Sequence, residues 1–206
     1  MTKVLLINGS PRKAGNTNLA LSEIMKQLEK NGIDAEIVQV GTKAVRGCIA
    51  CGRCGELGRC VFDDDICNRV AEKMAECDAL VVGSPVYWGQ PNGTVLSLLQ
   101  RMLYSQGKVV ANKPVAGVCV CRRGGSTMAV QALTMPFHLL GCPIVTSQYW
   151  PVVFGRAEGE AALDAEGMQT MRTLADNMAF LLKKIHAAGE PQYPQREEHV
   201  YTHFIR

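Results

Sequence analysis

The chain has 206 residues, of which 47% are hydrophobic and 20% are charged, as in a globular domain with a substantial core. The formal net charge of +3 is spread along the sequence, which gives no indication of a nucleic-acid partner. No segment approaches the roughly 18 apolar residues of a membrane helix, and the start lacks the plan of a signal peptide. We therefore expect a cytoplasmic protein that makes no contact with a membrane.

Short apolar runs alternate with segments of helical periodicity along most of the chain. The predicted strands are 4–7, 34–40, 79–84, 115–121 and 144–149. The predicted helices follow them and start near residues 17, 63, 92, 127 and 164, with Asn16 or Thr17 as the cap of the first. This alternation predicts an α/β domain over residues 1–188, with five parallel strands and helices on both faces, followed by a tail over 189–206.

The loop 8–18 joins the first strand to the first helix. Such a crossing offers free backbone N–H groups at the positive end of a helix dipole, and Ser10, Arg12 and Thr17 add hydroxyls and a guanidinium. Its two glycines match neither the Walker loop nor the dinucleotide fingerprint, so a lone monophosphate fits it better. An ordinary strand-to-helix turn is the alternative.

Two further loops follow strands of the same predicted sheet. Tyr87 and Trp88 stand beside a glycine in the loop 85–91, which suits a planar heterocycle such as a flavin or, alternatively, a pair of core-capping aromatics. The loop 122–126 contains paired glycines, which let backbone donors approach a ring edge closely. Ligands of open parallel sheets bind at the edge where the strands end, so we expect the three loops to form one site.

The motifs Gly9-Ser10-Pro11-Arg12, Gly15-Asn16-Thr17 and Ser84-Pro85-Val86-Tyr87-Trp88-Gly89 resemble those of the flavodoxin-fold NAD(P)H-dependent FMN reductase family. The resemblance extends from residue 3 to about residue 182 and implies a flavodoxin-like, doubly wound sheet of order 2-1-3-4-5. It implies FMN as cofactor, with its phosphate in the first loop and its ring on the other two, and NAD(P)H as electron donor. The implied FMN contacts are Ser10, Arg12, Asn16, Thr17, Asn18, Pro85, Val86, Tyr87, Trp88, Gly89, Arg122, Gly124 and Gly125. No catalytic side chain is expected, because the cofactor carries the chemistry.

Four of the nine cysteines are crowded into the glycine-rich segment 47–60, which predicts neither helix nor strand. Disulfides are not expected in the cytosol. The spacing of Cys48, Cys51, Cys54 and Cys60 resembles the motif of the iron–sulfur flavoproteins, a branch of the same family, and implies a [4Fe–4S] cluster beside the flavin. Zinc and an empty motif are the alternatives. The other cysteines are predicted to be buried in the core: Cys67, Cys77, Cys119, Cys121 and Cys142.

The sequence thus predicts an oxidoreductase that passes electrons from NAD(P)H through FMN, and through the cluster, to an unidentified acceptor. A cluster-free FMN, quinone or azo reductase, a non-enzymatic electron carrier and a zinc-clipped interaction module are the alternatives. The apolar tail residues 200–205 need a partner surface, so we expect a homodimer or homotetramer in which the neighbour helps to cover the flavin. His199 and His203 have a metal-ligand spacing, but no third ligand accompanies them and no metal site is predicted there.

Overall fold

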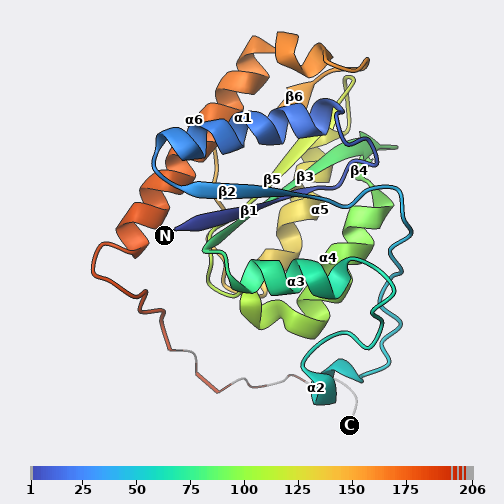
Figure 1. The fold of residues 1–206 in the computed structure, drawn as a ribbon, viewed down its shortest axis with the longest axis vertical. Helices are drawn as coiled ribbons and strands as arrows, with labels where there is room; N and C mark the ends of the chain where they lie inside the picture. The colour runs from blue at the N-terminus through green and yellow to red at the C-terminus, as the bar shows by residue number, and fades with distance from the viewer. Residues whose placement is uncertain (1, 196, 199, 201, 203–206) are drawn as a thin grey trace.

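The structure is a computed structural model that describes residues 2–195, 197–198, 200 and 202. A six-stranded sheet lies at its centre (Figure 1). Its parallel strands have the order β2-β1-β3-β5-β6, and the short β4 pairs antiparallel with β3 beside this path. The strands are β1 (Lys3–Asn8), β2 (Asp34–Gln39), β3 (Ala79–Tyr87), β4 (Gln90–Pro91), β5 (Val115–Cys121) and β6 (Val152–Phe154).

The fold is the predicted flavodoxin-like α/β class, but the predicted sheet differs in two details. The predicted five strands become six, because the chain after β3 turns back to form β4. The predicted strand 144–149 is wrong: Ile144 forms only an isolated bridge with Val115, and the last strand lies at β6. The reason is polarity. The run Thr146-Ser147-Gln148 cannot be buried on both faces of a sheet, whereas Val152 and Val153 are buried.

Five longer helices cover the two faces of the sheet. Their bounds are α1 (Asn16–Lys30), α3 (Cys67–Ala75), α4 (Gly93–Gln106), α5 (Ser126–His138) and α6 (Ala165–Ile185). In Figure 1, α1 and α6 lie together above the sheet, and α3 and α4 lie below it. Short helices are α2 (Cys54–Leu57), η1 (Gly107–Val109) and η2 (Glu160–Leu163).

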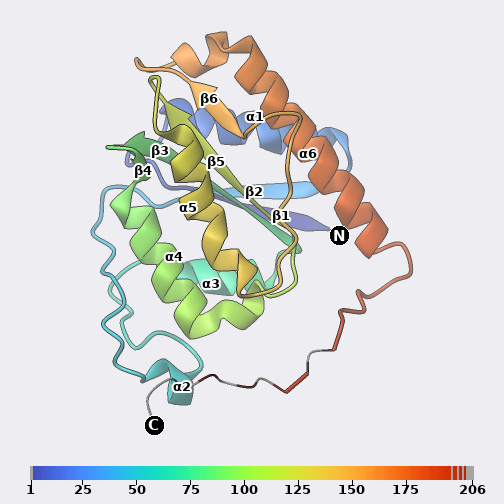
Figure 2. The same cartoon turned by 180° about the vertical axis from the view of Figure 1, so that it is seen from behind.

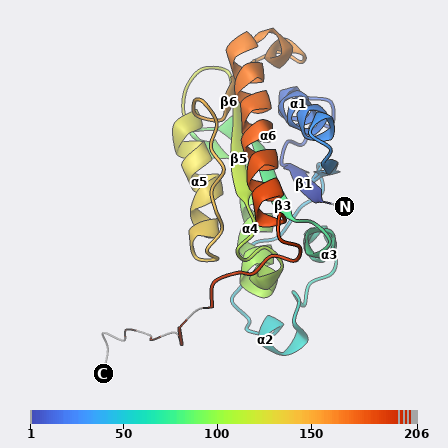
Figure 3. The ribbon, with the colours of Figure 1, turned by 90° about the vertical axis from the view of Figure 1, so that its left-hand side faces the viewer.

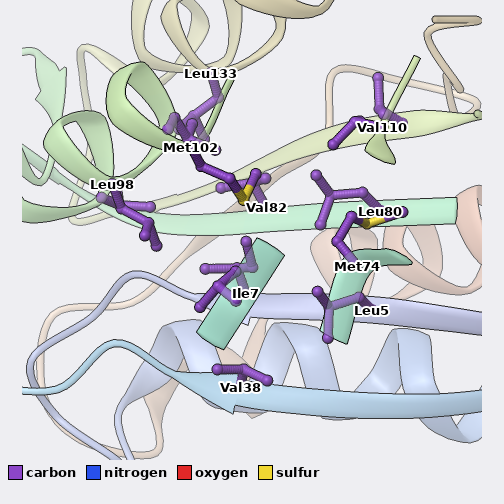
Figure 4. Packing of buried hydrophobic residues seen from close by; sticks show 14 of the residues in the cluster. Leu5, Ile7, Val38, Met74, Leu80, Val82, Leu98, Met102, Val110 and Leu133 are labelled. Carbon is purple, nitrogen blue, oxygen red and sulfur yellow. The ribbon is translucent and has the colours of Figure 1, made fainter. Parts of the chain in front are cut away.

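Two hydrophobic clusters hold these layers together, because successive side chains of a strand point to opposite faces. Val4, Leu6 and Val81 pack with residues of α1 and α6. Leu5, Ile7, Leu80 and Val82 pack with Met74, Leu98, Met102 and Leu133 from α3, α4 and α5 (Figure 4). The clusters bury both faces of the central strands, which explains their unbroken apolar runs.

Three details of the helices differ from the sequence prediction: one cap, one start and one extra turn. The first helix begins at Asn16 with Gly15 as its N-cap and has no side-chain cap, so the predicted capping by Asn16 or Thr17 is wrong. The helix predicted near residue 63 begins at Cys67, whose backbone N–H donates to the Asp65 carboxylate at 2.9 Å. The cysteine segment, predicted without regular structure, contains the single turn α2.

Two segments leave the body of the domain. The chain after β2 runs away from the sheet, and α2 lies beyond the end of α4 in Figures 1 and 2. After α6, residues 189–195 form no helix or strand and lead away from the domain (Figure 3). His199, His203 and most of the apolar tail lie outside the described residues, and Val200 is exposed.

Among the described helices, none combines the length and the apolar character that a membrane crossing requires.

Candidate functional site

A cavity of about 190 Å³ opens where β1, β3 and β5 end. It is lined by Ser10, Arg12, Gly15, Asn16, Thr17, Pro85, Val86, Tyr87, Val120, Cys121, Arg122, Gly155 and Arg156. The structure therefore brings residues of all three predicted loops to one place. It adds a fourth loop, 155–156, that sequence reasoning missed because no motif precedes it.

The start of α1 forms one end of this cavity. Because Gly15 provides no side-chain cap, the first backbone N–H groups of the helix, at Asn16 and Thr17, have no intrahelical partner. The Thr17 side chain is 2% exposed and lines the cavity. Arg12 is exposed at the cavity, and its backbone N–H donates to Ser10 Oγ at 3.1 Å. Unpaired donors at a helix N-terminus with a nearby cation form an anion site.

The two asparagines of this loop have different surroundings. Asn16 Nδ2 donates to the Ala157 carbonyl at 2.8 Å, and its Oδ1 accepts the N–H groups of Gly159 at 3.1 Å and Ala161 at 3.2 Å. The side-chain amide thus fixes residues 157–161, which follow the fourth loop, and only the backbone N–H of Asn16 is left for a ligand. Asn18 Nδ2 lies 3.4 Å from Ser22 Oγ, and Asn18 does not line the cavity as the described residues define it.

The second predicted loop is a tight hairpin. β3 continues to Tyr87, and Trp88 and Gly89 form a two-residue turn with φ of 53° and 77°, the positive values that a type I′ turn requires. The Trp88 side chain is fully exposed at the tip, and Tyr87 is 46% exposed beside the cavity. An exposed aromatic pair next to a cavity offers a flat surface to a planar ligand.

The third loop contacts this hairpin through glycine backbone. Gly125 has a φ of 84°, and a Cβ built on it would lie 2.7 Å from Gly89 Cα. Only glycine allows this approach. Arg122 lines the cavity, whereas Gly124, Gly125, Trp88 and Gly89 are absent from its described lining.

Two polar residues at strand ends support the first loop. Asn8 Oδ1 accepts the Ser10 N–H at 3.1 Å, and Asn8 Nδ2 donates to Gln39 Oε1 at 2.7 Å. Gln39 Nε2 in turn donates to the Ser10 carbonyl. Sequence reasoning missed these two supporting residues. Their only sequence signal is that each is a polar residue at the end of a predicted strand.

The four cysteines of the motif lie together in a second place. Cys48, Cys51, Cys54 and Cys60 all line one small hollow of about 20 Å³, whose wall includes Phe62, Arg101, Tyr104 and Ser105. All four thiols are free, and Ala50 N–H lies 3.4 Å from Cys48 Sγ as a donor. The five other cysteines are buried, as predicted.

The donor set fits an iron–sulfur cluster better than a single ion. Within the described part of the chain, no three Cys, His, Asp or Glu side chains are grouped closely enough to hold one metal ion. A single zinc ion needs all its sulfurs at about 2.3 Å from one point. A four-iron cluster takes one thiolate at each iron, so its ligands are more widely spaced around a shared volume. Four cysteines that line one hollow supply the number of thiolates that such a cluster takes.

The sequence predicts that the cluster lies beside the flavin. In the structure, however, the cysteine hollow does not adjoin the cavity at the strand ends. The cysteine hollow lies against Arg101 of α4, whereas Asn92, which caps this helix, follows the hairpin at the first cavity. Asn92 and Arg101 are nine residues apart along α4, a rise of about 14 Å at 1.5 Å per residue. The expectation of a cluster next to the flavin within one chain is wrong, because the insert leaves the sheet edge and packs farther along α4.

Buried polar contacts fix the two ends of the insert. Asn68 is 2% exposed and hydrogen-bonds both backbone groups of Cys60. Arg101 forms a buried ion pair with Asp65 and donates to the Arg46 carbonyl at 3.2 Å. Burial raises the pKa of the Asp65 carboxyl, but hydrogen bonds from Arg101 and from backbone N–H groups outweigh burial and bring it below its ordinary value. Sequence reasoning missed Asn68, Asp65 and Arg101.

Comparisons with known proteins agree with this geometry. Residues 2–157 match the family described as NADPH-dependent FMN reductase. An iron-sulfur flavoprotein of Methanocaldococcus jannaschii is 32% identical over 191 residues, which cover 89% of this chain and 98% of that protein. The crystal structure of RosB with bound 8-demethyl-8-formylriboflavin-5'-phosphate matches all of this chain and 94% of its own, with a TM-score of 0.67 and 16% identity.

A flavodoxin from the domain Archaea also shares the fold, at a TM-score of 0.59 and 12% identity over 89% of this chain and 99% of its own. At these identities the two solved structures speak for the fold alone. The family match and the 32% identity to the Methanocaldococcus jannaschii protein also identify the family. This chain belongs to the NADPH-dependent FMN reductase family of oxidoreductases, within its iron–sulfur flavoprotein branch.

Proposed function

We propose that this oxidoreductase takes electrons from NADH or NADPH and passes them through FMN and a [4Fe–4S] cluster to an acceptor. The observation that carries the proposal is the cavity at the strand ends, where unpaired N–H groups, the Thr17 hydroxyl and Arg12 meet the aromatic hairpin. Family membership supports FMN as the ligand of this cavity.

The residues divide into a phosphate end and a ring end. Ser10, Arg12, Thr17 and the backbone N–H of Asn16 would hold the FMN phosphate, since they combine hydrogen-bond donors with a cation at the N-terminus of α1. The hairpin from Pro85 to Gly89 would carry the ring, with Arg122 and the Gly124–Gly125 backbone at its edge. Bound FMN would supply acceptance of hydride from a nicotinamide and release of single electrons.

The second cofactor would lie in the cysteine hollow. Cys48, Cys51, Cys54 and Cys60 would be its thiolate ligands, since they face one volume and carry no disulfide. Bound there, the cluster would supply a one-electron relay between the flavin and the acceptor. Asn68 and the ion pair of Arg101 hold the ends of the segment, so the protein fixes the entry and exit of the ligand loop and leaves its middle free to adapt.

A cluster-free NAD(P)H-dependent FMN, quinone or azo reductase is the second candidate. It is favoured by one observation: the described cysteines are not grouped around a point that could hold a metal ion. In that case the insert would hold reduced thiols, and the flavin would deliver electrons directly to its acceptor.

We further propose that the chain acts as a homodimer or homotetramer, with a neighbour helping to cover the flavin. An apolar groove of about 510 Å³ lies beside the cysteine insert and is lined by Cys48, Gln100, Leu103, Tyr104, Pro136, Leu139 and Leu140. Leu139 is 86% exposed there, and an open apolar groove of this kind is typical of a protein contact. Light scattering at micromolar concentration tests this, since a mass near the 22.4 kDa of one chain would contradict it.

The test of the proposed function is the composition of protein reconstituted without oxygen. We expect one FMN per chain together with about four irons and four sulfides. Cys54→Ser should retain FMN and lose iron, whereas the control Cys77→Ala, at a buried thiol outside the insert, should retain both. FMN with no iron in the parent protein would leave the cluster-free reductase. NAD(P)H oxidation with a dye acceptor then separates either enzyme from a non-enzymatic carrier.

A further inference from the structure

Arg101 has an unusual environment on α4. Its side chain is 2% exposed, and its guanidinium is held from one side by Asp65. Nη1 donates to Asp65 Oδ2 at 2.7 Å and to the Arg46 carbonyl at 3.2 Å, and Nη2 donates to Asp65 Oδ1. These contacts fix both the plane and the direction of the guanidinium.

One nitrogen of this group, Nε, makes no hydrogen bond with any described residue. Arg101 Nε is buried and has no hydrogen-bond partner, and no other side-chain nitrogen or oxygen in the described part of the chain is in this condition. Leaving a buried donor of a charged group unpaired is costly, and native structures rarely do so. The orphaned N–H therefore indicates an acceptor close to Nε that completes this environment.

The location of Arg101 indicates where that partner lies. Arg101 lines the same hollow as Cys48, Cys51, Cys54 and Cys60. The buried Cys67 thiol also lies close to the guanidinium, which opposes the rise that burial causes in its pKa. Two sulfur acceptors are therefore candidates for the free Nε–H: a sulfur of a group held by the four cysteines, and the thiol of Cys67.

We propose, building on the cluster of the proposed function, that Arg101 is a positioning residue that donates its free Nε–H to a sulfur of that cluster and raises its reduction potential. A cluster with four thiolate ligands is anionic, and reduction adds a further negative charge. A fixed cationic donor therefore stabilises the reduced state more than the oxidised one, and hydrogen bonds to cluster sulfurs are a known control on potential. Asp65 and the Arg46 carbonyl fix the position of the guanidinium beside the hollow.

Two variants test this without depending on a single substitution. Arg101→Lys keeps a positive charge that can pair with Asp65 but has no Nε–H in the same place. The double variant Arg101→Met with Asp65→Asn removes both charges at once, which avoids an unpaired buried carboxylate, and Asn keeps an oxygen for the Cys67 N–H. The control is Arg59→Gln, which removes an exposed cation next to Cys60 that pairs with Asp63.

The readout is the midpoint potential of the cluster, measured by anaerobic titration with electron paramagnetic resonance. At the parent's midpoint we expect the ratio of reduced to oxidised cluster to fall about tenfold in both test variants, a shift of about 59 mV for one electron. Arg59→Gln should shift it much less, because an exposed charge is screened. Cys67→Ala should leave it unchanged.

The possible failures are distinguishable. Parent protein that binds FMN but no iron after reconstitution overturns the cluster and this inference together. Parent protein with iron whose potential is unchanged in both test variants overturns the role of Arg101 and leaves the proposed function intact. A potential that moves in Cys67→Ala as much as in Arg101→Lys assigns the free N–H to Cys67 and overturns the inference as well.

Discussion

Asn68 holds Cys60 by both of its backbone polar groups. The Cys60 N–H donates to Asn68 Oδ1 at 3.1 Å, and Asn68 Nδ2 donates to the Cys60 carbonyl at 3.0 Å. The same Nδ2 also contacts the Phe62 carbonyl and the Asp63 carboxylate. The fourth cysteine is thereby attached to α3, whereas Cys48 and Cys51 are exposed in the loop.

Asn68→Ala should destabilise the protein and weaken its hold on iron. The substitution leaves the buried backbone groups of Cys60 without partners, which costs roughly 1–3 kcal/mol of unfolding free energy. Urea unfolding of the cluster-free protein and iron content after gel filtration measure the two effects. The control Asn177→Ala removes one exposed hydrogen bond, to the Thr146 carbonyl, and should change neither by much. Equal stability of the two variants would contradict the role given to Asn68.

Arg12→Ala should weaken FMN binding. Loss of a charge-assisted contact to phosphate is worth about 1.5–3 kcal/mol, so the dissociation constant should rise roughly ten- to a hundredfold. Fluorescence quenching of FMN measures it. Lys13→Ala is the matched control, because Lys13 is the next exposed cation of the same loop and is absent from the described cavity lining. If both variants bind FMN like the parent, Arg12 does not contact the phosphate.

Gly125→Ala should disturb the ring end of the site. The new methyl group would lie 2.7 Å from Gly89 Cα at a residue whose φ is 84°, so the hairpin or the third loop has to move. We expect a loss of unfolding free energy on the order of 1–3 kcal/mol and weaker FMN binding. Gly124→Ala is the control, since a methyl group there meets nothing within 4 Å and the residue needs no positive φ. Equal effects of the two substitutions would show that the contact with Gly89 is unimportant.

Glu36 on β2 should make part of the stability depend on pH. Hydrogen bonds from Lys73 and then from Lys3 lower the pKa of its carboxyl below the ordinary 4.5, against a smaller effect of burial. Because the folded pKa is the lower one, this stabilisation is present above about pH 4.5 and is lost as the pH falls through the folded value. The difference in unfolding free energy between the parent and Glu36→Gln should therefore shrink from pH 7 to pH 3. A difference that stays constant over this range would contradict the pairing.

Local patterns were sufficient to predict that three loops meet in one cavity at the strand ends. The run Val4-Leu5-Leu6-Ile7 predicts a strand buried on both faces, and the loop after it needs no distant contact to be recognised. Because the ends of parallel strands share one edge, the three loops could be brought together from the strand order alone. The prediction of the last strand failed for two reasons. The segment 144–149 begins with two aliphatic residues and continues with polar ones, and the position of β6 is set by its pairing with β5, which the local sequence does not reveal.

The cysteine insert could be predicted only as a list of candidate ligands. Its supporting residues come from other elements: Asn68 lies on α3, and Arg101 lies on α4, 36 residues after Asp65. Each looks in the sequence like an ordinary polar position of an amphipathic helix. Where the insert packs is decided by these contacts and not by periodicity, so its distance from the flavin could not be deduced from the fact that it follows β2.

Anaerobic titration of the reconstituted protein with NADPH and with NADH, followed by visible absorbance and electron paramagnetic resonance, tests the central claim most directly. The account predicts that one of the two nucleotides bleaches the flavin bands and also produces the signal of a reduced iron–sulfur cluster. In Cys54→Ser the same nucleotide should bleach the flavin alone. Protein that carries iron and FMN, but whose iron–sulfur signal never develops while the flavin is fully reduced, would contradict it.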